Sequence, residues 1–366
     1  MWPLSTGESF MNSASRRTSA SFLEGVRTRG VLLLMPSAKA SLDDSAYWSW
    51  CLAAGFQEIG VPVFSNESSS FASRGITVAA APEVIHDDTM VIGDISAIES
   101  CNSECVTLAR RVFERARRSA LLCMSDVVSS VDFPETAPVF VAHSNSRIFA
   151  RGHRIPWAFG LSREVIDKIA GAHRPQVRER LFLRNFRPSG NQSVRNALDL
   201  SFVKRLADKV AIDTSFDNHG RWNSHYFDRL GGSLGCLAYG GHFVEDFFRR
   251  EEFRSQIGER RILSDEPAID RWDSWRFWES LASGCVTVAL DFDEYGLQIP
   301  VKPVNGVHYV GLRLDRLEDA VALLSGPQTP LAVIAENGRE WVTTHYAPAP
   351  VAHLFLETME RLEESQ

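Results

Sequence analysis

Arg276 and Glu279 stand three residues apart in the segment RWDSWRFWESLASGCVTVAL, residues 271–290. On a helix this spacing projects both side chains from one side, while Trp278 and Leu281 supply an apolar side for packing. A guanidinium matches phosphate oxygens, and a carboxylate one turn on can accept hydrogen bonds from a ribose diol. The pair therefore indicates either a nucleoside diphosphate site or an ordinary ion pair on a helix surface.

The start of the same helix also suits an anion. Asp270 and Asp273 resemble an acidic capping arrangement, and Ser274 falls in the first turn, where backbone N–H groups lack helical partners. The helix dipole is positive at that end, which favours phosphate. After the helix, residues 283–285 (Ser-Gly-Cys) allow a tight turn into an apolar strand, residues 286–290. The segment thus predicts a helix whose beginning faces a ligand.

Residues 274–288 read SWRFWESLASGCVTV, close to a pattern of the form S-x-R-x-x-E-A-L-x-x-G-C-x-P-V. This segment resembles the donor-binding corner of GT-B glycosyltransferases, especially the exostosin-like and spore-maturation-protein-like groups with a family 1/4-type C-terminal domain. Thr287 stands where those groups often have Pro. The resemblance runs from residue 181 to the end of the chain. It implies an α/β fold of two Rossmann-like α/β/α lobes facing across a cleft, and a nucleotide-diphosphate sugar as donor substrate.

Apolar runs and polar loops predict the first lobe. Residues 30–36 (GVLLLMP) read as a buried strand, followed by a polar loop, a helix over 46–59 and a strand over 61–64. Strand, loop, helix and strand in that order open a doubly wound domain. Further strands are predicted near residues 76–80, 89–92, 120–123 and 138–142.

A second strand series begins after a polar stretch with a Pro, residues 171–178. Its predicted elements are a strand over 180–186, a helix over 193–207, strands over 209–213 and 234–239, a helix over 224–230, the segment described above and a helix over 314–324. The predicted domains are a flexible tail, residues 1–25, an acceptor lobe, 26–175, a donor lobe, 176–346, and a C-terminal helix, 347–366, that returns to the first lobe.

Two loops add candidate donor contacts. In residues 187–195, Arg187 and Arg195 offer positive charge and Gly190 permits close backbone approach, although a solvated loop would contain the same residues. After the strand over 234–239, Gly241 and His242 could meet the base or sugar, or form a plain turn. With Ser274, Arg276 and Glu279 they complete the predicted donor set, and no metal ligand is predicted.

A transferase also needs a base near the acceptor hydroxyl, usually a carboxylate or imidazole. Asp43, Asp44 and His143 are the candidates in the first lobe. Asp44 would equally serve as a helix cap and His143 as an ordinary residue at a strand end. Retaining GT-B enzymes often carry a second Glu eight positions before the ribose Glu, and here that position is Arg271. The stereochemical outcome is left open.

Composition limits the partners. The chain has 366 residues, a net charge of −7 and 44% hydrophobic residues, which suits two domains and argues against a nucleic-acid partner. The cysteines form no Cys-x-x-Cys pair, no apolar run approaches a membrane span, and no cofactor is required. We expect a cytoplasmic protein, with peripheral contact to the inner membrane face and the oligomeric state left open.

Together these features predict an enzyme that transfers a sugar, without a metal, to a hydroxyl of a glycan, lipid-linked or small-molecule acceptor. An epimerase or hydrolase of nucleotide sugars on the same fold is an alternative, as is a non-catalytic protein that keeps the fold. Transfer to an added acceptor separates the first prediction from the other two. The base, sugar and acceptor are not specified by the sequence.

Overall fold

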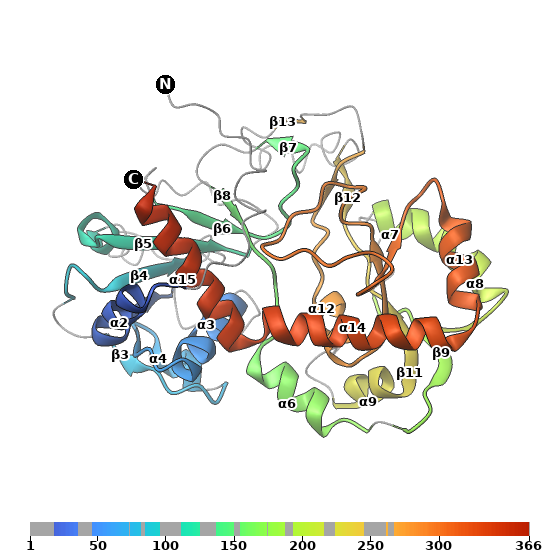
Figure 1. Cartoon of the computed structure of the whole chain (residues 1–366), viewed down its shortest axis with the longest axis horizontal. Coiled ribbons are helices and arrows are strands. Elements are labelled where there is room, and N and C mark those ends of the chain that lie inside the picture. The colour runs from blue at the N-terminus through green and yellow to red at the C-terminus, as the bar shows by residue number, and fades with distance from the viewer. Residues whose placement is uncertain are drawn as a thin grey trace. The chain divides into compact units, whose positions relative to one another are not determined.

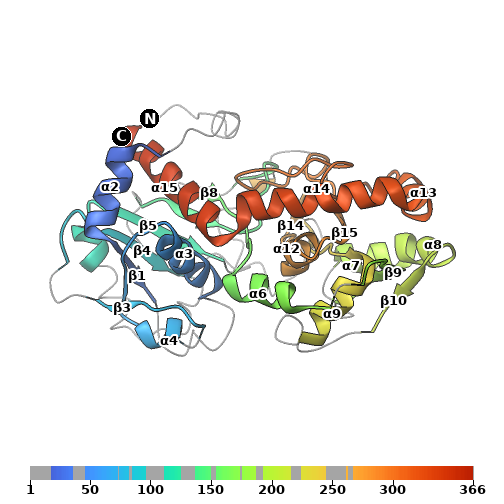
Figure 2. The ribbon, with the colours of Figure 1, turned by 60° about the horizontal axis from the view of Figure 1, so that its bottom comes forward.

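The structure, a computed structural model, describes twelve ranges of the chain: residues 18–35, 46–72, 74–81, 85–95, 111–124, 137–149, 154–173, 175–186, 193–215, 224–244, 261–262 and 267–365. The chain divides into two compact units. Unit 1 comprises residues 1–142, 150–157 and 347–366, and unit 2 comprises residues 143–149 and 158–346. Figures 1 and 2 show the chain from two directions.

Unit 1 is built on a seven-stranded sheet in the order β3-β2-β1-β4-β5-β6-β8, in which every neighbouring pair is parallel. In chain order its strands are β1 (Val31–Leu34), β2 (Val63–Ser65), β3 (Ala79–Ala80), β4 (Met90–Asp94), β5 (Arg118–Cys123), β6 (Val139–Val141) and β8 (Arg154–Pro156). The central strands β1 and β4 are buried along their whole length. Such continuous apolar runs are typical of a parallel sheet covered on both faces.

Alternate residues of these strands supply the two faces of the sheet. Leu32, Val91 and Leu121 form one buried cluster with Phe113. On the other face, Phe140 of β6 packs against Phe355 with ring centroids 4.6 Å apart.

Two helices far apart in sequence lie side by side in unit 1: α3 (Tyr47–Glu58) and α15 (Pro348–Glu364), drawn in blue and red in Figures 1 and 2. A Cβ atom at Gly55 of α3 would lie 2.0 Å from the Pro348 carbonyl oxygen. Only glycine therefore allows this approach, and Phe56 meets Phe355 just beyond it, at 6.0 Å. The remaining labelled helices of unit 1 are α2 (Ala20–Arg29) and α4 (Ser68–Ala72).

Unit 2 contains a five-stranded parallel sheet in the order β10-β9-β11-β15-β16. Its strands are β9 (Glu179–Leu183), β10 (Ala211–Asp213), β11 (Ser233–Leu237), β15 (Val286–Leu290) and β16 (Val310–Leu312). Two short antiparallel pairs accompany it: β12 (His242–Phe243) with β14 (Ile269–Asp270), and β7 (Ile148–Phe149) with β13 (Arg261–Ile262).

The helices of unit 2 are α6 (Arg163–Gly171), α7 (Ser193–Leu198), a π-helical turn η4 (Asp199–Val203), α8 (Lys204–Ala207), α9 (Ser224–Gly232), α12 (Trp275–Ala282), α13 (Leu317–Ser325) and α14 (Gln328–Tyr346). Helices α12 and α14 pack on each other and on β15. Aromatic rings fill this contact: Trp278 of α12 stacks on Trp341 of α14 at 6.0 Å and meets Tyr346 at 4.6 Å. The packing holds α12 firmly against the sheet.

Two parallel α/β units confirm the predicted fold class of two Rossmann-like domains, and α15 lies in unit 1, where the GT-B resemblance placed the last helix. The predicted tail is wrong at its end, because residues 20–25 already belong to α2, whose start is capped by Ser19. The division near residue 157 also differs from the predicted 175, since α6 packs with α9 and α12 of unit 2. Among the described helices, none has the length and apolar character needed to cross a membrane.

Candidate functional site

The strand order of the unit 2 sheet reverses between β9 and β11. From β9 the chain moves outward to β10, and it then returns to place β11 on the other side of β9. Loops leaving β9 and β11 at their carboxyl ends therefore diverge, and this is where open parallel sheets bind ligands. Residues 184–186 follow β9 and residues 238–241 follow β11. We call this place the cationic edge, for the arginines described next.

Arg195 and Arg276 meet at the cationic edge. The Nε–H of Arg195, from α7, donates to the Tyr239 carbonyl oxygen at 3.3 Å, and the Nε–H of Arg276, from α12, donates to the Asn185 carbonyl oxygen. Burial, and then the positive charge of Arg276, lower the pKa of Arg195 to about 9. Neither guanidinium forms an ion pair with a carboxylate of the described residues. Two like charges held this way favour an anion between them.

Phe186 separates Arg195 from a third arginine. The guanidinium of Arg184 lies over the Phe186 ring at 4.2 Å and that of Arg195 at 4.8 Å, as in cation–π pairs. Arg184 is neutralised by an ion pair with Asp199, so it does not add to the unpaired charge. Tyr239 packs edge-on to Phe186, and within the described part of the chain its buried hydroxyl has no hydrogen-bond partner.

Gly241 and His242 serve packing. Gly241 has φ +107°, and a Cβ there would lie 2.7 Å from the Asp270 carbonyl oxygen of β14. The Gly241 carbonyl accepts from Val194 N–H of α7 at 3.3 Å. His242 is buried in β12, which pairs with β14. The protein's own backbone thus comes close to Gly241, and a role in donor binding stays a prediction for both residues.

The start of α12 is held by a buried carboxylate. Ser274 is the N-cap residue, yet its side chain makes no capping bond. The carboxylate of Asp273 accepts instead from Phe159 N–H at 2.9 Å and from Trp278 Nε1–H at 2.7 Å. Burial raises the pKa of Asp273, while nearby His143 opposes that shift. From the sequence Asp273 is predicted only as part of a cap, because its partner Phe159 is distant along the chain.

His143 lies in unit 2, not in the first lobe where it was predicted to act. Its Nδ1 accepts a hydrogen bond from Asp273 N–H at 3.0 Å, and its ring meets Phe159 and Trp272 edge-on. A positive φ of 57° turns the chain here immediately after β6. With Nδ1 accepting, the neutral ring carries its proton on Nε2. In this arrangement His143 holds the start of α12, and its role as a base stays a prediction.

Glu279 is buried, with 4% of its surface exposed, and accepts from the Tyr226 hydroxyl of α9 at 2.8 Å. Burial, and then the Glu279 charge, raise the pKa of Tyr226. The charges of Arg276 and Glu279 both act on the pKa of Tyr226 and of Cys236, which is consistent with the predicted placement of the two residues on one side of α12. Contact with a ribose stays a prediction.

A small pocket lies beside the start of α12, at the carboxyl ends of β11 and β15. Ser274 and Asp273 line it together with Tyr239 and Gly240. Its apolar wall comes from the residues before and within α12 and from the end of β15 and the loop that follows it: Trp272, Phe277, Leu290, Phe292 and Leu297. The pocket therefore lies between the start of α12 and Tyr239 of the cationic edge.

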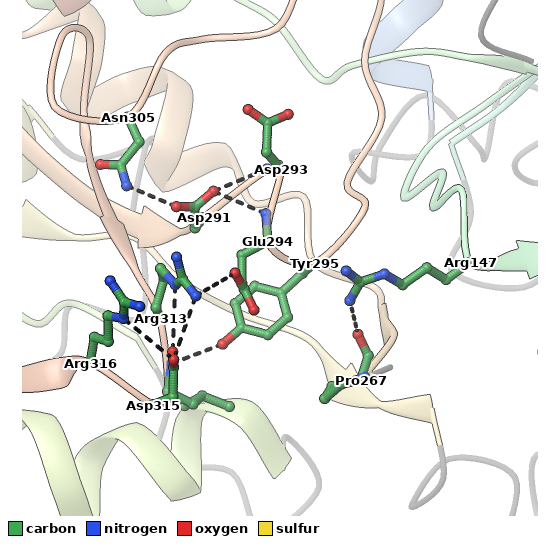
Figure 3. Close-up of polar contacts among 11 residues, drawn as sticks. Arg147, Pro267, Asp291, Asp293, Glu294, Tyr295, Asn305, Arg313, Asp315 and Arg316 are labelled. Atoms are coloured by element: carbon green, nitrogen blue, oxygen red, sulfur yellow. Dashed lines mark hydrogen bonds and ion pairs between the residues drawn. The ribbon is translucent and has the colours of Figure 1, made fainter. Parts of the chain in front are cut away.

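The acidic loop after β15 engages its own partners (Figure 3). Asp291 accepts from the backbone N–H groups of Asp293 and Glu294 and from Asn305 Nδ2 at 2.8 Å. Glu294 pairs with Arg313 at 2.9 Å. These carboxylates stabilise the loop, and the described residues contain no group of three His, Cys, Asp or Glu placed to hold a metal ion.

In unit 1 the strand order reverses between β1 and β4, and Asp94 is the last residue of β4. Its buried carboxylate accepts from the Ser49 hydroxyl of α3 at 2.7 Å. Asn66 fixes the end of β1 by bonding both backbone groups of Met35 at 2.8 Å. Asp94 is not predicted from the sequence, because there the residue reads only as the polar end of an apolar strand.

Several predicted residues lie outside the described ranges: Asp43, Asp44, Arg187 and Gly190. Of the others, the structure brings Arg195 and Arg276 together at the cationic edge, with Ser274 and Glu279 on the same helix as Arg276.

No protein-family model matches the chain, and no curated protein matches it. Solved structures similar to it include Anabaena HepE in complex with UDP, at 11% identity and a TM-score of 0.45, covering 91% of this chain and 100% of that one. A glycosyltransferase from Rickettsia africae matches at 10% identity and 0.44, covering 92% and 100%. Staphylococcus aureus TarM matches at 10% and 0.37, covering 75% and 55%.

Proposed function

We propose that the chain is a glycosyltransferase that binds a nucleotide-diphosphate sugar at the cationic edge of unit 2. One observation carries the proposal: Arg195 and Arg276 converge at the switch point of a parallel sheet, and neither is paired with a described carboxylate. Holding two guanidiniums together in a partly buried place is unfavourable unless an anion joins them. A diphosphate has the charge and the oxygen geometry for that role.

The same helix supplies the rest of the donor contacts in this proposal. Backbone N–H groups at the start of α12, beside Ser274, would donate hydrogen bonds to phosphate oxygens. Glu279, one turn on from Arg276, would accept hydrogen bonds from the ribose diol. As the bond to the sugar breaks, negative charge grows on the leaving diphosphate, and two fixed guanidiniums would stabilise it. The transfer we propose therefore needs no metal ion.

The acceptor hydroxyl must lose its proton to a base. In unit 1 we propose Asp94 for that role beside Asp43 and Asp44, because it is a buried carboxylate at the carboxyl end of the sheet, where ligands gather. His143 is the remaining candidate. We infer that the acceptor is a glycan, a lipid-linked molecule or a small molecule, handled in the cytoplasm.

The test is a thermal-shift screen of UDP, GDP, dTDP, CMP and ADP, each with magnesium and with a chelator. One nucleotide should raise the Tm selectively and equally in both conditions, because a ligand that binds only the folded state stabilises it. The shift should disappear in Arg276→Met. Stabilisation only with magnesium would overturn the metal-free mechanism, and stabilisation that persists in Arg276→Met would overturn the site.

A further inference from the structure

A second, larger pocket lies at the opposite edge of the same sheet. Arg178, just before β9, Leu234 of β11 and Ser283, just before β15, line it at the amino ends of these strands, and α14 closes one side. Its volume of about 470 Å³ lies within the roughly 300–1,000 Å³ typical of small-molecule sites. The proposed donor contacts use the carboxyl ends, so this pocket is separate from them.

The charges on its wall leave an excess of one positive charge. Arg178 donates to the carbonyl oxygens of Ser233 at 3.0 Å and of Ser283, so its guanidinium is a fixed charge built into the wall. Arg339 of α14 forms a two-point ion pair with Glu336, at 2.6 and 3.2 Å. Arg339 and, more weakly, Arg178 lower the pKa of Glu336. One carboxylate thus faces two guanidiniums.

Besides these charged groups the wall carries apolar surface, the side chains of Gln176 and Gln328, and one hydroxyl. Leu234, Ala332 and Ala335 contribute aliphatic surface. Ser283 is 2% exposed, and its hydroxyl has no hydrogen-bond partner among the described residues. A buried hydroxyl without a partner is unfavourable, so a ligand that bonds Ser283 beside the apolar surface would be favoured.

We propose that this pocket binds a small organic monoanion with a compact apolar body. Its anionic group would lie against Arg339, in the field of Arg178, and its apolar part against Leu234 and Ala335. The site is independent of the proposed donor site, because none of its residues contributes to the cationic edge.

Three molecules of one shape and different charge test the proposal: benzoate (−1), benzamide (0) and benzamidinium (+1). Saturation-transfer NMR on the full chain should show benzoate binding most tightly and benzamidinium least. Ala332→Trp, which fills the pocket from an exposed helix position, should remove the benzoate signal. Val333→Trp, at the next exposed position of α14 and outside the lining, is the matched control and should keep it.

Removing a positive and a negative charge from the pocket wall, one at a time, provides a second test. Arg339→Gln should weaken benzoate binding roughly tenfold, as expected for losing a charge-assisted hydrogen bond. Glu336→Gln should strengthen it, because the competing carboxylate is gone. Absence of benzoate binding, equal binding of all three probes, or a signal that survives Ala332→Trp would each overturn the proposal.

Discussion

The two units build the same kind of sheet edge and equip it with opposite charge. Where the sheet of unit 1 reverses direction, the described residues present a buried carboxylate, Asp94, held by Ser49. At the matching place in unit 2 they present two arginines, Arg195 and Arg276. Fold topology thus selects the place of a site, while the side chains there select its chemistry. An acidic edge suits proton removal and a cationic edge suits a leaving phosphate.

The largest expected effect comes from the acidic edge. Asp94→Asn keeps the shape but removes the base, so kcat for sugar transfer should fall about a hundredfold or more while nucleotide binding stays unchanged. Ser49→Ala, which removes only the hydrogen bond to the carboxylate, is the control and should lose far less. Full turnover in Asp94→Asn, with loss in Asp43→Asn or Asp44→Asn, would move the base to those residues.

The cationic edge should show the next largest effect. Arg276→Met should weaken nucleoside diphosphate binding by roughly ten- to a hundredfold in calorimetry, because a charge-assisted pair is lost. The Tm of the ligand-free protein should change little, since the mutation also relieves repulsion with Arg195. Arg205→Met removes an exposed arginine of unit 2 that pairs with Glu318, and it should leave binding intact. Equal losses in both variants would show a non-specific charge effect.

Glu279 offers a sharper and smaller test. If its carboxylate receives the ribose diol, the wild type should bind a nucleoside diphosphate about tenfold more tightly than its 2′-deoxy analogue. Glu279→Gln should erase that preference. Tyr226→Phe removes the hydroxyl that bonds Glu279 in the structure and should preserve the preference. A preference that survives Glu279→Gln would assign the diol to another residue.

The smallest effect concerns stability away from the cationic edge of unit 2. Burial lowers the pKa of both His308 and His345, and the charge of His345 lowers the pKa of His308 further. Unfolded histidines then bind protons at a higher pH than folded ones, so stability is lost as the pH falls through about 6.5. We expect a Tm about 1–2 °C lower at pH 5.5 than at pH 7.5 from this source. His308→Gln should reduce the difference, and exposed His173→Gln should not.

The fold was predictable because apolar strands and intervening helices are local patterns, as in residues 30–36 and 286–290. Arg276 and Glu279 were predictable for the same reason, since helical spacing alone places them together. Asp94 and the hydroxyl of Tyr239 were not, because their significance depends on strand order. The grouping of His143 with unit 2 was not predictable either, because it depends on contacts distant along the chain, such as the hydrogen bond from Asp273.

The place of α15 bears on how the protein is made. Unit 1 receives this helix from residues 348–364, which a ribosome synthesises after all of unit 2. Until then the apolar surface of α3 around Phe56 lacks the Phe355 ring that packs against it, and the Pro348 carbonyl that packs against Gly55 is also missing. Unit 2, whose residues 143–149 and 158–346 are complete earlier, can fold first. We therefore expect unit 2 to complete its fold before unit 1, although unit 1 begins earlier along the chain.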